Sequence, residues 1–171
     1  MAARPLSLKA RALQWLAQRE HSHVELRRKL LRLARQRAAE QAGEAGDDAP
    51  ATDAAAEVDA VLDWLVANGY LSDARFVESR VNARSARYGN LRIRHELGLH
   101  GAALDAATSE RLKDSELARA RAVWTRKYGG APADTAVERA RQIRFLAGRG
   151  FSADVIRRVV RAGAAEPDEH A

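Results

Sequence analysis

The chain of 171 residues contains no cysteine. This absence excludes disulfide bonds and thiolate metal sites, and it fits a protein that works in a reducing compartment. A run of about 18 apolar residues, which a membrane-spanning helix needs, is also missing, and residues 1–8 lack the apolar core of a signal peptide. We therefore expect a cytoplasmic protein with no membrane partner.

Signals for β-strands are equally scarce. β-Branched residues are few, and they do not alternate with polar residues over the length of a strand. Apolar residues instead recur at helical spacing almost everywhere, as in Val58, Val61, Leu62 and Leu65. The sequence therefore predicts an all-α protein with no β-sheet.

One short pattern repeats along the chain: an apolar pair, a few spacer residues, a basic or small turn, and a new helix start. Its copies lie at 15–22, 64–72, 97–102 and 145–152. A helix pair that cannot bury its apolar face alone must stack on its neighbours, so the repetition predicts an elongated array of about nine helices. Such a surface suits long partners better than small substrates.

Local signals place the ends of these helices. Predicted starts lie at Ser7, Ser22 with Glu25 as a capping box, Ser72, Asp134 or Thr135, and Ser152. Predicted stops lie at Asn68–Gly69, Gly89–Asn90 and Gly129–Gly130. We predict one short helix between Gly101 and Leu112 and a separate one over 115–128. The helix after Thr135 would be anchored by Val137, Ile143 and Leu146.

Positive charge is concentrated in two blocks, 1–37 and 117–163, within a chain of net charge +6 and pI near 10.3. Between them, residues 40–59 include no Lys or Arg, and the chain is acidic again from Ala164. Such blocks suit a polyanionic partner, because phosphate attraction and counterion release dominate binding of that kind. The alternative is that the arginines only solvate the outer faces of helices.

The segment 38–56 departs from the helical pattern, since it has no large apolar residue with which to offset the entropy of ordering. We predict a mobile linker or a frayed helix end. An alternative is an acidic arm that folds back on the basic block.

Motifs for catalysis are missing as well. The five histidines have no ligand set around them, and the chain has neither a phosphate-cradling glycine loop nor a nucleophile elbow. We therefore expect no enzyme, no catalytic residue, no metal site and no cofactor.

In order and spacing, the junctions resemble those of the RecX family of recombinase regulators, from about Leu8 to Val160. The matching pieces are Trp15-Leu16, Arg19-Glu20-His21-Ser22, Gly69-Tyr70-Leu71-Ser72-Asp73, Glu96-Leu97 with Gly101, and Arg149-Gly150-Phe151-Ser152. The resemblance implies three tandem three-helix repeats, here 1–71, 72–114 and 115–163, followed by an acidic disordered tail at 164–171. The acidic insertion at 38–56 departs from the family, in which we expect a short connection.

The resemblance also implies a function. RecX proteins bind along the groove of the RecA filament on single-stranded DNA and inhibit filament growth, ATPase, strand exchange and coprotease activity, which links them to recombination, DNA repair and the SOS response. A monomer fits groove binding best. Two alternatives are a direct DNA-binding protein of helix-turn-helix type and an adaptor that binds another acidic protein.

Basic residues are the candidates for contact with the filament or its DNA. Arg80, Arg84 and Arg87 share one side of a helix, and Arg92 and Arg94 follow just beyond the turn. In the third repeat the candidates are Arg126, Lys127, Arg141 and Arg144. The alternative for Arg126 and Lys127 is a structural role, because cations stabilise the C-terminus of a helix.

The tryptophans are a different kind of candidate, because aromatic rings can stack on the bases of a single strand. Trp15 and Trp64 precede leucine in two copies of the junction. That position predicts packing in the core for both of them, and we extend the prediction to Trp124.

Overall fold

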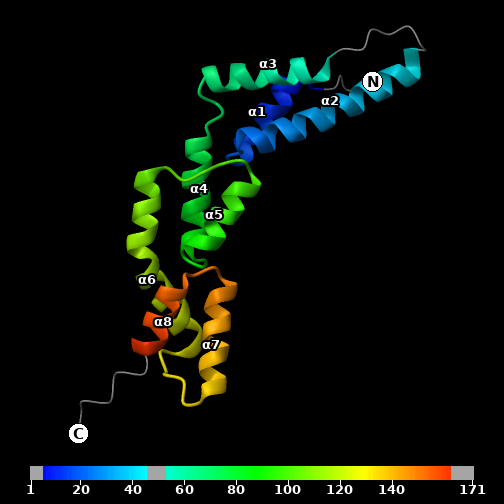
Figure 1. Ribbon diagram of the computed structural model, residues 1–171. Coiled ribbons are helices and arrows are strands. Elements are labelled where there is room, and N and C mark those ends of the chain that lie inside the picture. The colour runs from blue at the N-terminus through cyan, green and yellow to red at the C-terminus, as the bar shows by residue number, and fades with distance from the viewer. Residues whose placement is uncertain (1–5, 46–52, 163–171) are drawn as a thin grey trace. The chain divides into compact units, whose positions relative to one another are not determined.

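The computed structural model describes residues 6–45 and 53–162, with side chains except for 41–45. In this part of the chain there are helices and no strand, as predicted, and no helix there is long and apolar enough to cross a membrane. The helices are α1 Leu8–Gln18, α2 His23–Ala45, α3 Ala54–Ala67, α4 Asp73–Ser85, α5 Asn90–Leu99, α6 Ala106–Tyr128, α7 Ala136–Gly148 and α8 Ala153–Ala162 (Figure 1).

The described residues form eight helices, where the sequence predicts about nine. The two helices expected on either side of Leu112 are one continuous helix, α6, which starts behind the Asp105 cap. Ser115 does not cap a new helix, because its hydroxyl donates a hydrogen bond back to the carbonyl of Arg111 at 2.8 Å. The expected boundary between the second and third repeats therefore falls inside α6.

The acidic insertion is partly helical. Helix α2 continues to Ala45, and α3 begins behind Asp53, whose carboxylate accepts hydrogen bonds from the backbone N–H groups of Ala55 and Ala56. Of the two expectations for this segment, the end of a helix rather than a linker therefore describes 38–45, where alanine and glutamate extend α2 by their helix propensity. Residues 46–52 and the expected acidic tail lie outside the described residues.

Most predicted helix starts are confirmed. Ser7 and Ser72 cap α1 and α4, and Thr135, rather than Asp134, caps α7. Ser22 caps α2 by accepting from the backbone N–H of Glu25 at 3.1 Å. The other half of that capping box is absent, since the carboxylate of Glu25 pairs with Arg19 instead. Gly69 adopts the left-handed conformation expected at the end of α3, with φ of 72°.

The chain divides into two compact units, Met1–Phe76 with His100–Ala102, and Val77–Leu99 with Ala103–Ala171. In the first unit, α1, α2 and α3 pack together around leucines and Val58 that are fully buried. In the second unit, α6, α7 and α8 enclose a core that includes Trp124, Leu146, Phe151 and Ile156 (Figure 1).

The tryptophans pack as the sequence predicts. Trp124 is buried and donates its indole N–H to Gln142 at 2.9 Å. Trp15 and Trp64 lie partly buried against the core of the first unit. Lys9 covers the ring of Trp64, with Nζ 3.1 Å from the ring centroid, and Lys29 covers that of Trp15 at 4.2 Å. These contacts favour the structural interpretation over base stacking.

The prediction of which face of α7 is buried was wrong. Leu146 is fully buried, but Val137 is 76% exposed and Ile143 is 39% exposed. The buried face of α7 instead runs through Gln142 and Leu146, because Gln142 has a hydrogen-bonding partner in the core. Two apolar side chains of α7 are thus left at the surface.

Candidate functional site

Two glycine turns dock backbone to backbone in the second unit. The N–H of Gly89 donates to the carbonyl of Arg149 at 2.9 Å, and the N–H of Leu91 donates to the carbonyl of Gly150 at 3.1 Å. A Cβ atom on Gly89 would lie 2.2 Å from the carbonyl oxygen of Gly150, so no larger residue fits. The docking fixes the residues that precede each glycine, Tyr88 and Arg149, close to one another.

A buried carboxylate holds the same two turns from the side of α6. Glu116 is only 5% exposed, and its Oε1 accepts from the backbone N–H of Asn90 at 2.9 Å and of Ser152 at 3.4 Å. Its Oε2 accepts from the hydroxyl of Ser152 at 3.1 Å, so this hydroxyl does not cap α8 as predicted. Because a negative charge is favourable at the start of a helix, one side chain stabilises the starts of both α5 and α8.

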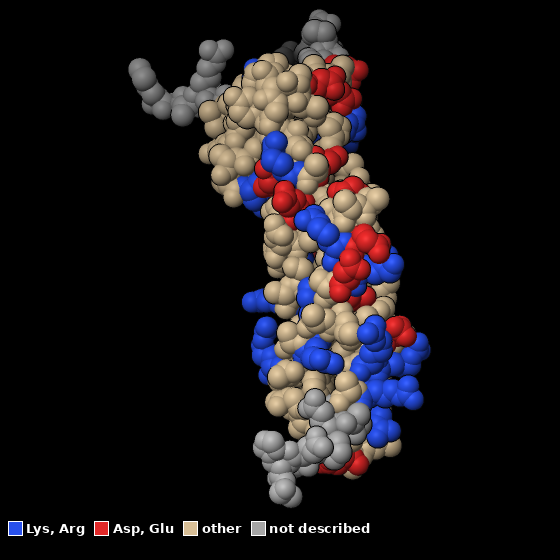
Figure 2. Space-filling view, turned by 90° about the vertical axis from the view of Figure 1, so that its left-hand side faces the viewer, with Lys and Arg blue, Asp and Glu red and all other residues tan. Residues whose placement is uncertain are grey.

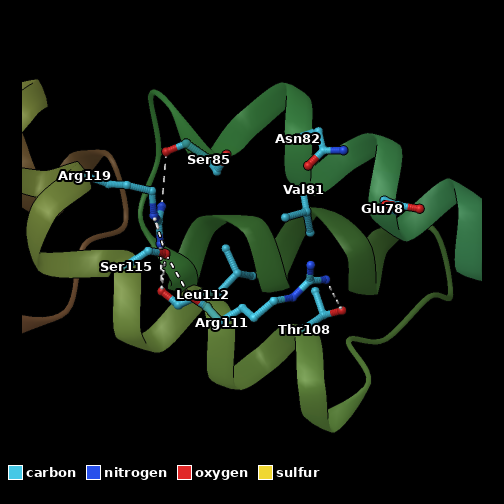
Figure 3. A pocket seen from close by; sticks show the side chains of 9 residues that line it. All are labelled: Glu78, Val81, Asn82, Ser85, Thr108, Arg111, Leu112, Ser115 and Arg119. Carbon is cyan, nitrogen blue, oxygen red and sulfur yellow. Dashed lines mark hydrogen bonds between the residues drawn. The ribbon is translucent and has the colours of Figure 1, made fainter.

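Arg119 lies one turn beyond Glu116 on α6, and it connects α6 to the end of α4 (Figure 3). Its guanidinium donates to the carbonyls of Ser85 and Tyr88, at 3.1 and 2.8 Å, and to that of Leu112 at 3.0 Å. Burial lowers the pKa of Arg119, while the charge of Glu116 acts in the opposite direction. The arginine is thus committed to backbone carbonyls of α4, of the turn after it and of α6, and it borders a small gap of about 160 Å³ between α4 and α6.

This scaffold forms an open cleft of about 570 Å³ where α4, α6 and α7 end. We call it the basic cleft. Four cations line it: Arg87 after α4, Arg126 and Lys127 at the end of α6, and Arg149 after α7. The rest of the lining is Tyr88, Val123 and Phe145, so none of the described residues that line the cleft is acidic.

Aromatic rings orient some of the cations around the cleft. The guanidinium carbon of Arg149 lies 4.6 Å from the ring centroid of Phe145, which in turn meets Tyr128 edge to face at 5.5 Å. Arg92 lies over the ring of Tyr88 at 4.6 Å. Such stacking holds a guanidinium plane in place without consuming its hydrogen-bond donors.

The candidate cations from the sequence have different surroundings. Arg84 and Arg92 share the carboxylate of Glu96, at 2.9 and 3.5 Å, and Arg94 donates to the hydroxyl of Ser109 at 2.8 Å. Arg80 is half-buried and also interacts within the protein. These four residues are therefore partly committed to the fold.

The remaining candidates are more available. The side chains of Arg87, Arg126 and Lys127 are exposed and come together in the basic cleft. Arg141 and Arg144 are exposed on α7 but do not line the cleft. Arg149, which follows Arg141 and Arg144 beyond the turn, lies beside Arg87, Arg126 and Lys127 in the cleft.

Figure 2 shows that, on the face it presents, Lys and Arg gather in the lower part, at the level of α8 in Figure 1, with few acidic side chains among them. Among the described residues, no group of three or more His, Cys, Asp or Glu side chains lies close enough together to hold a metal ion.

Comparison with known proteins identifies relatives over nearly the whole chain. A family model described as "RecX, third three-helix domain" matches residues 114–160. The regulatory protein RecX of Ralstonia nicotianae is 45% identical over 96% of this chain and 93% of the relative. Those of Leptothrix cholodnii and Herminiimonas arsenicoxydans are 48% and 47% identical, over 95% of this chain and 93% and 96% of the relatives.

Proposed function

The chain belongs to the RecX family of regulatory proteins, and on that premise we propose that it is a non-enzymatic regulator of the recombinase RecA. It lies as a monomer in the groove of the RecA filament on single-stranded DNA. There it inhibits filament growth and lowers ATPase, strand-exchange and coprotease activity. Its role belongs to recombination, DNA repair and the SOS response, and its place is the cytoplasm.

The basic cleft supports this proposal, because it brings exposed cations together at one place on the surface. Arg126 and Lys127 are exposed and make no hydrogen bond or ion pair with another described side chain, so their donors are available to phosphate oxygens. Phosphates attract such cations and release counterions when they bind. We therefore place the strand enclosed in the filament at this cleft, with Arg87 and Arg149 beside it. Arg141 and Arg144, on the exposed side of α7, are secondary candidates.

The helix-turn-helix alternative finds less support at the junction before α2. A reading helix presents its first turn to DNA. Here the N–H of His23 donates to Asp73 at 2.7 Å, and the hydroxyl of Ser22 donates to the carbonyl of His100 at 2.7 Å. The start of α2 is thus occupied by contacts within the first unit.

The test is RecA's DNA-dependent ATPase and filament length, measured with substoichiometric amounts of this protein. The wild type should inhibit the ATPase and shorten the filaments. Charge reversal in the cleft, R126E/K127E, should raise the concentration for half-inhibition about tenfold or more, which corresponds to about 1.4 kcal/mol.

A matched control separates a local contact from the net charge. R32E/R35E makes the same change in charge on α2, at two exposed arginines outside the cleft. It should inhibit nearly as well as the wild type. If the folded wild type affects neither ATPase nor filament length, the proposed function is wrong. If the two double variants lose inhibition equally, the cleft is not the contact.

A further inference from the structure

A second basic surface lies between α7 and α8. None of the described residues that line it also lines the basic cleft. This second surface is a groove of about 420 Å³, and we call it the α7–α8 groove. Arg139 and Ile143 line it from α7, one helical turn apart. From α8, Asp154, Arg157, Arg158 and Arg161 line it at the spacing of a single helix face, together with Val160.

The charges in this groove are only partly balanced. Arg157 pairs with Asp154 at 3.3 Å. Arg139, Arg158 and Arg161 are exposed, and their side chains make no hydrogen bond or ion pair with another described residue. The helix dipole stabilises a cation in the last turn of a helix, where Arg161 lies. It does not stabilise Arg158 in the middle of α8 or Arg139 in the first turns of α7. Like charges one turn apart are mildly unfavourable, so the arrangement gains from an anionic partner.

The groove also has an apolar floor. Ile143 is 39% exposed, because it lies outside the core to which Leu146 and Val159 belong. Val160, only 8% exposed, also lines the groove, and the arginines add the aliphatic stems of their side chains. An aliphatic side chain of a partner, once seated there, removes apolar surface from water.

We propose that the α7–α8 groove binds an acidic polypeptide segment that carries an aliphatic anchor residue. Guanidinium groups bind carboxylates through paired hydrogen bonds, and three of them surround this groove without a carboxylate of their own. Nucleic acid fits less well, because single strands bind on aromatic rings and none of the described residues that line this groove is aromatic. The two basic surfaces thus take chemically different partners, phosphates in the basic cleft and carboxylates in the groove.

The test is fluorescence anisotropy with two labelled synthetic peptides, one of sequence Asp-Glu-Asp-Leu-Asp-Glu and one with serine in place of leucine. Full-length protein should bind the leucine peptide about tenfold more tightly, as expected for burial of one aliphatic side chain. R158Q/R161Q should weaken binding of the leucine peptide about tenfold. I143S should bring the affinities for both peptides to the same value. Circular dichroism checks that both variants stay folded, which the exposure of these side chains leads us to expect.

The control is R126E/K127E, which changes more charge but lies in the basic cleft. It should leave the affinity for the leucine peptide nearly unchanged. Three results would overturn the proposal: equal affinity of the wild type for the two peptides, equal weakening by the cleft variant, or a dimer in sedimentation that R158Q/R161Q dissociates. Tighter binding of an oligothymidylate than of the peptide, lost on I143S, would assign the groove to nucleic acid instead. None of these measurements uses RecA, so their outcome is independent of the proposed function.

Discussion

Replacement of Gly89 by alanine should disrupt the docked turns on which the basic cleft depends. The added Cβ would lie 2.2 Å from the carbonyl oxygen of Gly150 and 2.3 Å from the backbone N and Cα of Phe151. Ordinary contact begins at 3.4 Å, so the two backbones must separate by more than 1 Å (3.4 − 2.2 = 1.2). All three contacting atoms belong to backbone, which cannot turn aside as a flexible side chain can.

The cost follows from what that separation breaks. A movement of this size removes both hydrogen bonds between the turns, from Gly89 to Arg149 and from Leu91 to Gly150. Each unsatisfied backbone group costs about 1–3 kcal/mol, and overpacking alone costs a similar amount. We expect G89A to lower the free energy of unfolding by about 3–5 kcal/mol, measured by urea denaturation followed by circular dichroism.

Two other glycines provide matched controls. A Cβ on Gly98 in α5 or on Gly148 at the end of α7 would meet nothing within 4 Å. Alanine should raise the free energy of unfolding at these positions, by about 0.5–1 kcal/mol at Gly98, because it restricts the unfolded chain and favours the helix. If G89A unfolds at the same urea concentration as the wild type, the docking of the turns does not stabilise the protein.

Three further predictions concern buried and half-buried polar groups. E116A should lower the free energy of unfolding by about 2–4 kcal/mol, because it leaves the backbone donors at the starts of α5 and α8 without their acceptor; urea denaturation measures this, and a loss below about 0.5 kcal/mol would contradict it. R119M keeps the stem but removes the donors to the helix-end carbonyls, and thermal denaturation should show a fall in Tm of several degrees, about 4 °C or more. Burial lowers the pKa of His21, so the unfolded state binds a proton more readily and stability falls as the pH drops below 6.5. Comparison of urea midpoints at about pH 7.5 and 5.5 should show a smaller difference for H21Q than for the wild type.

The carboxylate of Glu25, which lies beside His21, should affect the stability of the protein at lower pH than His21 does. Burial tends to raise the pKa of Glu25, but the hydrogen bond and charge of Arg19 and the charges of His21 and His100 outweigh it, so the pKa lies below 4.5. Its stabilising contribution is therefore present above that value and is lost as the pH falls through the lowered pKa.

The sequence predicts the local features of this fold well, because they depend on near neighbours. The cap at Ser7 and the buried stripe of Val58, Leu62 and Leu65 follow from spacing and side-chain chemistry within one helix. The continuous α6 was missed because Ser115 can cap a helix or bond back to its own turn, and its sequence neighbours do not decide between the two. The exposure of Ile143 was missed because Gln142 is buried in its stead. Gln142 accepts a hydrogen bond from the buried indole of Trp124, a contact between helices that the sequence of α7 does not reveal.

The basic cleft could be predicted only in pieces. Arg87, Arg126 and Lys127 were candidates, but they belonged to separate clusters along the chain. They meet because Gly89 and Gly150 dock and because Glu116 bonds to both turns, and these contacts join residues far apart in sequence. A carboxylate that serves two helix starts has no local sequence signal, since the same glutamate on a solvated face would give the same pattern.

We propose that the basic cleft lies against the DNA strand inside the RecA filament. A photo-crosslinking amino acid placed at Lys127 tests this claim directly, with the same group at Arg32 as the control. We expect a covalent adduct with single-stranded DNA from position 127 when RecA filaments are present, and little or none from position 32. Equal adducts from both positions, or an adduct with RecA alone from position 127, would contradict it.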